Sequence, residues 1–137
     1  MQYRPDTKAI LQAIQDLLMK EVLPKIEEDE LLSYKTLVSW NILGVVVREL
    51  EKEDEFTYEE YKSFQDNFKF SEISFRQFDD FVRLSRVEKI NVMKMLNQSL
   101  AKEIRNSKEA DPKSETWKHI KATLKNNLQI SNPRFVT

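Results

Sequence analysis

Apolar residues recur at a helical period along most of the chain. Near the amino terminus their spacing of three and four residues predicts a helix over about 7–23. Asp6 stands where an N-cap belongs, and Pro24, which lacks an amide hydrogen, is expected to stop or kink the helix. The predicted buried stripe consists of Ile10, Leu11, Ile14, Leu17, Leu18 and Val22.

A second helix, expected over about 31–50, is apolar around most of its circumference. Such a helix belongs inside a fold, so we expect it to be central and buried. Gly44 costs about 1 kcal/mol relative to alanine in a helix, which indicates that a neighbouring helix crosses closely there. Acidic residues 27–30 complement the dipole at its start, an interpretation we prefer to a metal site. The apolar positions are Leu37, Val38, Trp40, Ile42, Leu43, Val45, Val46 and Val47.

Nine of the fourteen aromatic residues fall between positions 56 and 81, and we interpret most of them as core. Thr57 with Glu60, and Ser74 with Gln77, match the capping-box pattern. In both cases a hydrophobic residue precedes the cap and can staple onto the next turn. Two helix starts are therefore predicted, with a break between about 67 and 74.

From residue 74 to about 108 the pattern stays helical, and it is compatible with one long helix or with two. A third capping box, Ser85 with Glu88, favours two helices that meet near residues 85–91. The core candidates are Phe78, Phe81, Val82, Val92, Met95, Leu96, Leu100 and Ile104.

The last predicted helix begins at Asp111, with Pro112 in its first turn, where a missing amide hydrogen costs nothing. Pro133 disfavours helical geometry at Asn132 and should end it. Its expected buried stripe is Trp117, Ile120, Leu124 and Leu128.

These elements predict an all-α fold, a single-domain bundle of five or six helices over residues 1–137 with the second helix at its centre. One glycine and four prolines are too few for the tight turns of a β-sandwich or barrel. The most apolar stretch, 37–47, falls short of the roughly 20 residues that span a bilayer. The amino terminus lacks the uninterrupted apolar core of a secretory signal, so we expect no cleavage and no membrane partner.

Composition argues against most enzymatic sites. The chain has no cysteine, which removes thiol chemistry and the need for an oxidising compartment, so we expect a cytoplasmic protein. His119 is the only histidine, expected to be solvated or partly packed, and one glycine cannot build a nucleotide-binding loop. We therefore predict no catalytic residue, no metal and no cofactor, and the pI near 5.9 disfavours nucleic acid as a partner.

Polar residues at otherwise apolar positions are the remaining candidates for a site. Buried polar groups need hydrogen-bond partners, and a buried arginine pairs with a carboxylate or binds an anion. Two interpretations stay open: a satisfied network that fixes helix register, and a small pocket for a carboxylate or phosphate group. The candidate ligand-binding residues are Asn41, Arg48, Asn97, Arg105 and Arg134.

Several short stretches together resemble an uncharacterised family of small bacterial proteins known as a domain of unknown function. The stretches are Arg4-Pro5, Leu23-Pro24, Asn41 to Arg48-Glu49-Leu50, Leu96-Asn97 to Ile104-Arg105, and Asn132-Pro133-Arg134-Phe135. At Asn106 this chain departs from the glycine that is usual in the family. The resemblance implies genes near aminoglycoside-kinase-type phosphotransferases and acyl-CoA dehydrogenases, and hence an accessory protein in such metabolism.

The sequence therefore favours a non-catalytic helical interaction protein that binds a protein partner or itself through a patch including some of the aromatic helices. The alternative is a binder of a small anionic ligand, held by the arginine and asparagine cluster.

Overall fold

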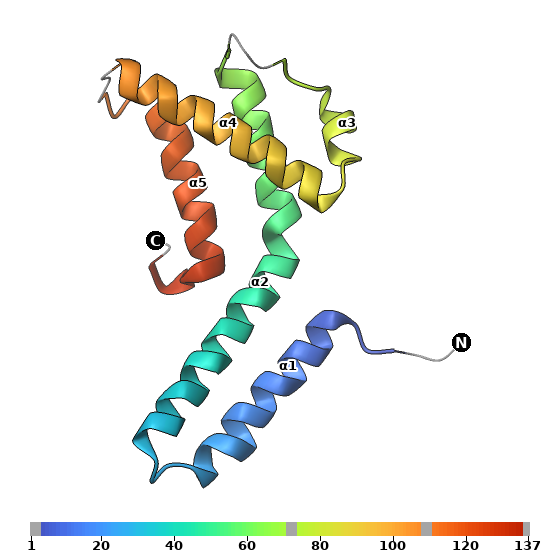
Figure 1. Cartoon of the computed structure of the whole chain (residues 1–137), viewed down its shortest axis with the longest axis vertical. Coiled ribbons are helices and arrows are strands. Elements are labelled where there is room, and N and C mark those ends of the chain that lie inside the picture. Colours follow the sequence, from blue (N-terminus) through green and yellow to red (C-terminus); the bar gives the residue numbers. More distant parts are fainter. Residues whose placement is uncertain (1–3, 71–73, 108–110, 136–137) are drawn as a thin grey trace. The chain divides into compact units, whose positions relative to one another are not determined.

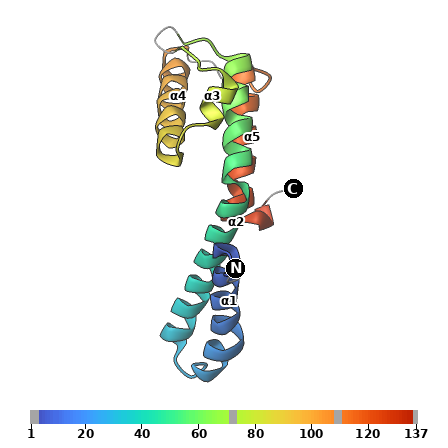
Figure 2. The same ribbon diagram turned by 90° about the vertical axis from the view of Figure 1, so that its right-hand side faces the viewer.

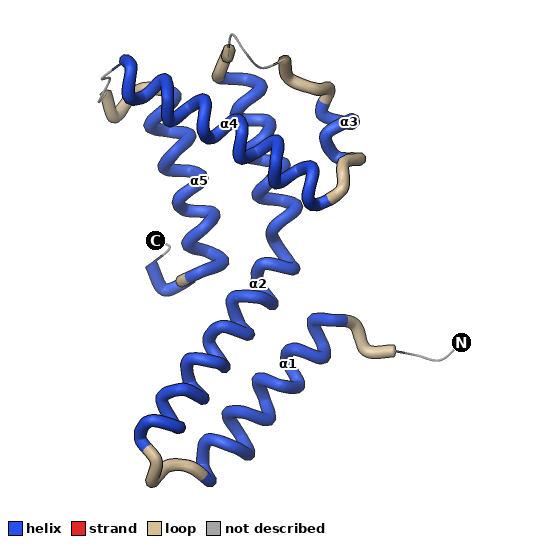
Figure 3. The backbone as a smooth tube through the Cα atoms, in the orientation of Figure 1, coloured by secondary structure: helices blue, strands red, loops and turns tan. Residues whose placement is uncertain are grey.

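The computed structural model describes residues 4–70, 74–107 and 111–135, and these residues form five α-helices and no strand (Figures 1 and 3). The all-α fold class is thus confirmed. A π-helical turn over Leu18–Val22 and a 3-10 turn over Leu23–Lys25 extend the first helix, and a 3-10 turn over Pro133–Phe135 follows the last. The helices are α1 (Thr7–Leu17), α2 (Glu30–Asn67), α3 (Phe78–Val82), α4 (Arg86–Ser107) and α5 (Glu115–Ser131).

Internal contacts divide the chain into two compact units. Unit 1 comprises Met1–Glu53 and Asn127–Thr137, and unit 2 comprises Asp54–Asn126. Helices α2 and α5 each contribute residues to both units, so the division does not follow helix boundaries. The single domain over residues 1–137 stays a prediction.

Unit 1 contains a helical hairpin in which α1 runs beside the first half of α2 (Figures 1 and 2). The Asp6 carboxylate accepts a hydrogen bond from the Ala9 amide at 2.7 Å, which confirms the predicted N-cap. Helical turns continue through Pro24 to Lys25, because proline is tolerated in the first turn of a 3-10 segment. The chain then turns into α2.

Polar contacts hold the two helices of the hairpin together. Lys8 forms an ion pair with Glu51, and the Gln15 side-chain amide donates to the Trp40 carbonyl at 3.1 Å. A Cβ atom at Gly44 would lie 3.1 Å from Gln15 Nε2 and 3.2 Å from Arg48 Nη1. The space beside Gly44 is thus occupied by the side chain of Gln15 from α1 and by Arg48 of α2 itself, whereas the close crossing of a neighbouring helix at Gly44 stays a prediction.

Unit 2 holds the hydrophobic core. The rings of Tyr61 and Phe81 stack at a centroid distance of 3.7 Å, and Phe64 is fully buried. All nine aromatic residues between 56 and 81 are buried or half-buried, as the core interpretation predicted. The core cluster consists of Tyr61, Phe64, Phe68, Phe81, Met93, Leu96 and Leu100.

Helix α2 is longer than predicted and runs without a break from Glu30 to Asn67 (Figure 3). The helix start predicted at Thr57 is wrong, because Thr57 lies inside α2. Residues 51–55 are mostly glutamate and lysine, which favour helix, so nothing interrupts the backbone hydrogen bonds before Thr57. The predicted end near Asn67 is confirmed.

The start predicted at Ser74 is also wrong, since α3 begins at Phe78 and its N-cap Gln77 makes no side-chain capping bond. Ile73, the predicted staple residue, lies outside the described residues. The third capping box is confirmed: the Glu88 carboxylate accepts from the Ser85 amide at 2.9 Å, and α4 begins at the next residue, Arg86. Residues 74–107 therefore contain two helices.

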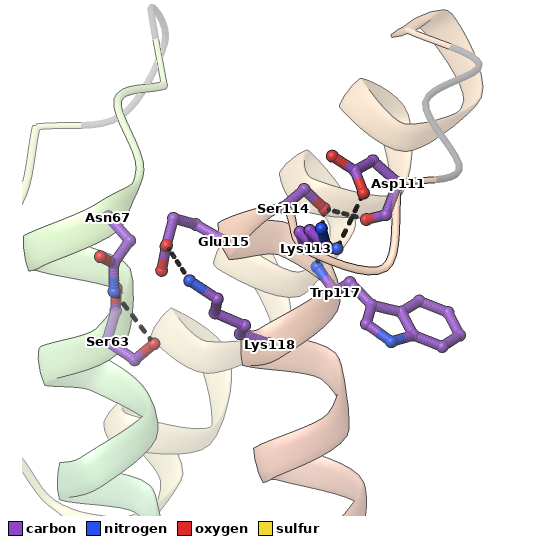
Figure 4. A network of polar contacts seen from close by, with 8 residues as sticks. All are labelled: Ser63, Asn67, Asp111, Lys113, Ser114, Glu115, Trp117 and Lys118. Atoms are coloured by element: carbon purple, nitrogen blue, oxygen red, sulfur yellow. Dashed lines mark hydrogen bonds and ion pairs between the residues drawn. The ribbon is translucent and has the colours of Figure 1, made fainter.

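Helix α5 starts at Glu115, four residues later than predicted (Figure 4). The Asp111 carboxylate accepts from the Lys113 amide at 2.9 Å and so closes a turn instead of capping a helix. Ser114 provides the cap, because its hydroxyl accepts from the Trp117 amide at 3.2 Å. The helix ends at Ser131, as Pro133 predicted.

The predicted buried faces are wrong at several positions on α1, α2, α4 and α5. On α5, Trp117, Ile120 and Leu124 are exposed and His119 is buried, the reverse of the expected arrangement. On α1, Ile10, Ile14 and Leu17 are exposed, and on α2 Leu37, Val38 and Ile42 are exposed. On α4, Met95 is exposed and Met93 is buried in its place.

Candidate functional site

Arg48 is the predicted site residue with the most informative contacts. It is half-buried, and its Nε donates to the Ile130 carbonyl at 2.7 Å, within unit 1. Nearby, Lys52 Nζ donates to Gln129 Oε1 at 2.9 Å. Because carbonyls in the last turn of a helix lack helical partners, Arg48 caps the C-terminal end of α5.

The other predicted site residues are exposed. Asn41 and Arg134 belong to unit 1, together with Arg48, whereas Asn97 and Arg105 belong to unit 2. The Asn97 amide donates to Glu60 Oε1 at 2.9 Å, which is a hydrogen bond between helices of the same unit. A common ligand-binding role for the five residues stays a prediction.

His119 and Ser63 form a pair that sequence reasoning missed. His119 is only 5% exposed, and its Nδ1 lies 2.8 Å from Ser63 Oγ. The ring centroids of Phe64 and Phe68 lie 4.3 and 5.2 Å from the imidazole centroid. Burial lowers the pKa of His119, and its buried Nε2 has no hydrogen-bond partner among the described atoms.

A serine beside a histidine can act as a nucleophile with its base. Such a pair also needs access for substrate and a group that orients the imidazole through its other nitrogen. Here that nitrogen, Nε2 of His119, is enclosed and unpartnered in the described structure. We therefore interpret the contact with Ser63 as packing that joins α5 to α2.

Exposed apolar side chains are concentrated in unit 1. Eleven large hydrophobic residues of this unit are exposed, compared with six in unit 2, counting the described residues. Four of them follow one another along α2 at spacings of three and four residues and define what we call the outer stripe. The outer stripe consists of Leu31, Tyr34, Val38 and Ile42, with exposed fractions of 37% to 65%.

The outer stripe faces away from α1. Successive residues of an α-helix rotate by about 100°. Val38 therefore lies about 200° from Thr36, and Ile42 lies about 200° from Trp40. Thr36 is buried, and the Trp40 carbonyl bonds to α1. The α1-facing side of α2 is thus covered, and the opposite apolar side is open.

A row of charges accompanies the outer stripe. Lys35, Ile42 and Glu49 are seven residues apart, so they lie on nearly the same face of α2. A cation and an anion therefore flank an exposed isoleucine. In the sequence, residues 37–47 are apolar around most of the helix. That pattern predicted burial and did not distinguish it from an exposed apolar face.

Unit 2 contains a cavity of about 250 Å³, which we call the Arg76 pocket. Sequence reasoning could not find it, because its lining residues come from distant parts of the chain. They include Tyr61, Phe75, Arg76, Val92, Met95 and Leu96.

No helix within residues 4–70, 74–107 and 111–135 combines the length and hydrophobicity needed to cross a bilayer. The same described residues contain no group of three or more histidine, aspartate or glutamate side chains arranged to hold a metal ion.

Comparison with curated proteins and with solved structures finds no match. A family model described as a domain of unknown function, DUF6285, matches residues 24–135, which is most of the chain. This match extends from the turn between α1 and α2 to the 3-10 turn after α5. The chain therefore belongs to the DUF6285 family.

Proposed function

We propose that this chain is a non-catalytic helical interaction protein that pairs with a second copy of itself through the outer stripe. The exposure of Leu31, Tyr34, Val38 and Ile42 on one continuous helix carries the proposal. Removing apolar area from water is the main driving force of association, and this area has no cover within its own unit. The cysteine-free composition supports a cytoplasmic location.

Charge complementarity favours a second copy as the partner. If two α2 helices meet antiparallel with a two-fold axis at Ile42, Lys35 of each copy lies opposite Glu49 of the other. In a parallel, in-register arrangement the like charges would face one another. The row is therefore complementary to itself in the antiparallel orientation, as the isologous interface of a two-fold dimer requires.

The accessory role in acyl-CoA or phosphotransferase-type metabolism, which the family resemblance implies, is compatible with such a dimer. Two copies would present two identical sets of surfaces to an enzyme. That part of the proposal is supported by the resemblance alone.

Sedimentation equilibrium of the full chain over a range of concentrations tests the pairing. We expect the mass to rise from 16.3 kDa towards twice that value. Ile42→Lys should keep the chain monomeric, because it places two ammonium groups at the two-fold axis. Leu50→Lys is the matched control, since Leu50 is equally exposed on α2 but about 80° away from Ile42.

Circular dichroism should show the same helix content in both variants. A wild-type chain that stays monomeric at every concentration would contradict the proposal. So would equal dissociation by Leu50→Lys and Ile42→Lys, because it would mean that the outer stripe is not the contact.

A further inference from the structure

The Arg76 pocket has an apolar floor and an open mouth. Tyr61 and Leu96, both 1% exposed, lie at its base, and Phe75 and Val92 are half-buried. The rings of Tyr61 and Phe75 contact edge to face at a centroid distance of 6.3 Å. Met95, an exposed residue of α4, also lines the cavity.

Two hydrogen bonds from α2 fix the backbone of Arg76 beside this cavity. The Tyr61 hydroxyl donates to the Arg76 carbonyl at 2.9 Å, and the Gln65 side-chain amide donates to it at 2.8 Å. A segment without regular secondary structure is thereby held at a defined position. Arg76, which this segment carries, is an exposed residue and is among those that line the pocket.

The charge of Arg76 acts at the floor of the pocket. Burial raises the pKa of the Tyr61 hydroxyl, whereas the positive charge of Arg76 lowers it. Glu88, an acid that also feels the charge of Arg76, is occupied by the Ser85 hydroxyl at 2.7 Å and by the Ser85 amide. Arg76 therefore lines a cavity with an apolar floor, and Glu88 is engaged in a helix cap.

We propose that the Arg76 pocket binds a small amphipathic carboxylate, with its hydrocarbon body against Tyr61, Val92 and Leu96 and its carboxylate on the Arg76 guanidinium. Guanidinium and carboxylate groups form charge-assisted, often bidentate hydrogen bonds. A volume of about 250 Å³ holds roughly eight groups the size of a water molecule. Hexanoate matches that size, and the apolar lining suits its chain.

Titration of the full chain with hexanoate, followed by ligand-observed NMR or calorimetry, tests this site. Hexanol and hexylamine are the matched ligands without the anionic group. We expect hexanoate to bind at least about tenfold more tightly than either, because a hydrogen bond to a charged group outweighs a neutral one. Equal binding of the three ligands would overturn the proposal, as would no binding of hexanoate up to its solubility.

Three variants test whether hexanoate binds in the Arg76 pocket. Arg76→Gln should weaken hexanoate binding about tenfold, and Met95→Trp should abolish it by filling the cavity from its exposed side. Arg83→Gln, which removes an exposed arginine outside the pocket, should leave the affinity unchanged. If Arg83→Gln and Arg76→Gln weaken binding equally, the ligand responds to general surface charge and the assignment is wrong. Circular dichroism of each variant separates lost binding from lost folding.

Discussion

The two units of this chain are built from the same long helix, yet they bury very different amounts of it. In unit 2 the second half of α2 supplies Tyr61, Phe64 and Phe68 to a core whose members are at most 8% exposed. In unit 1 the first half of α2 is equally apolar, but Val47 is the single large hydrophobic residue that is buried among the described ones.

The two halves of α2 differ in burial because different elements pack against them. In unit 2, the elements α3, α4 and α5 supply rings and aliphatic side chains that cover α2. In unit 1, α1 contacts α2 through Gln15 and Lys8, and the end of α5 contacts it through hydrogen bonds to Arg48 and Lys52. These neighbours leave the outer stripe of α2 exposed, and it is available for association.

The largest expected effect is on the core of unit 2. Phe64→Ala should destabilise this unit by about 3–5 kcal/mol, because it removes a fully buried ring and leaves a cavity. Denaturant unfolding measures the change, with Trp117 as the fluorescent reporter of unit 2 in a Trp40→Phe background and Trp40 as the reporter of unit 1 in a Trp117→Phe background. Ile14→Ala in unit 1 is the control and should stay within about 0.5 kcal/mol. Comparable losses in the two variants would remove the contrast between the units.

The second effect concerns the antiparallel pairing of unit 1. Lys35→Glu should weaken self-association by about 1–2 kcal/mol, because two ion pairs are replaced by two repulsive contacts. Adding Glu49→Lys should restore it, since the charges are then exchanged. Sedimentation equilibrium measures both constants. A double variant that associates no better than Lys35→Glu alone would rule out this register.

The two-fold axis at Ile42 can also be located covalently, because the chain has no cysteine of its own. Under mild oxidation, Ile42→Cys should form a disulfide-linked dimer. Leu50→Cys, equally exposed on the same helix, should form far less of it. Non-reducing electrophoresis reads out the result, and similar yields from the two variants would place the contact elsewhere.

A smaller effect tests helix boundaries in unit 2. Ser85→Ala removes the cap of α4 and should cost about 1 kcal/mol. Thr57→Ala, although it alters the same sequence pattern, should cost nothing or stabilise slightly, because alanine is the better residue inside a helix. Chemical denaturation compares the two. A loss for Thr57→Ala as large as that for Ser85→Ala would mean that a helix starts there.

The smallest effect is the pH dependence of unit 2. Burial lowers the pKa of His119, so the unfolded chain takes up a proton more readily than the folded one. The neutral imidazole of His119 therefore makes its full contribution to stability above the unfolded pKa of about 6.5. The free energy of unfolding falls as the pH decreases below that value. The Trp117 unfolding transition should show this slope, and His119→Phe should lack it.

Glu60 acts in the opposite direction at lower pH. Burial raises its pKa above the ordinary 4.5, although the hydrogen bond from Asn97 lowers it. Because the folded chain binds this proton more readily than the unfolded chain, protonation of Glu60 favours the folded state as the pH falls towards the raised pKa. If His119→Phe keeps the same slope just below pH 6.5, the imidazole is not its source.

The candidate site shows how far sequence patterns reach. Arg48 was singled out as a polar residue at an otherwise apolar position, and a carboxylate partner or a bound anion was expected; its Nε donates to the Ile130 carbonyl, 82 residues away. The Arg76 pocket and the contact between Ser63 and His119 carry no sequence signature. Their members become neighbours only when α2, α4 and α5 pack.

The sequence by itself determined the helical class and those boundaries that depend on adjacent residues. The Asp6 cap, the Ser85 and Glu88 box and the end of α5 before Pro133 each require contacts within a few positions. Tertiary structure alone decided that His119 is buried while Trp117 is exposed, and that the chain divides into two units. A helical period shows that a face is apolar, but only the neighbouring helices determine whether that face is covered.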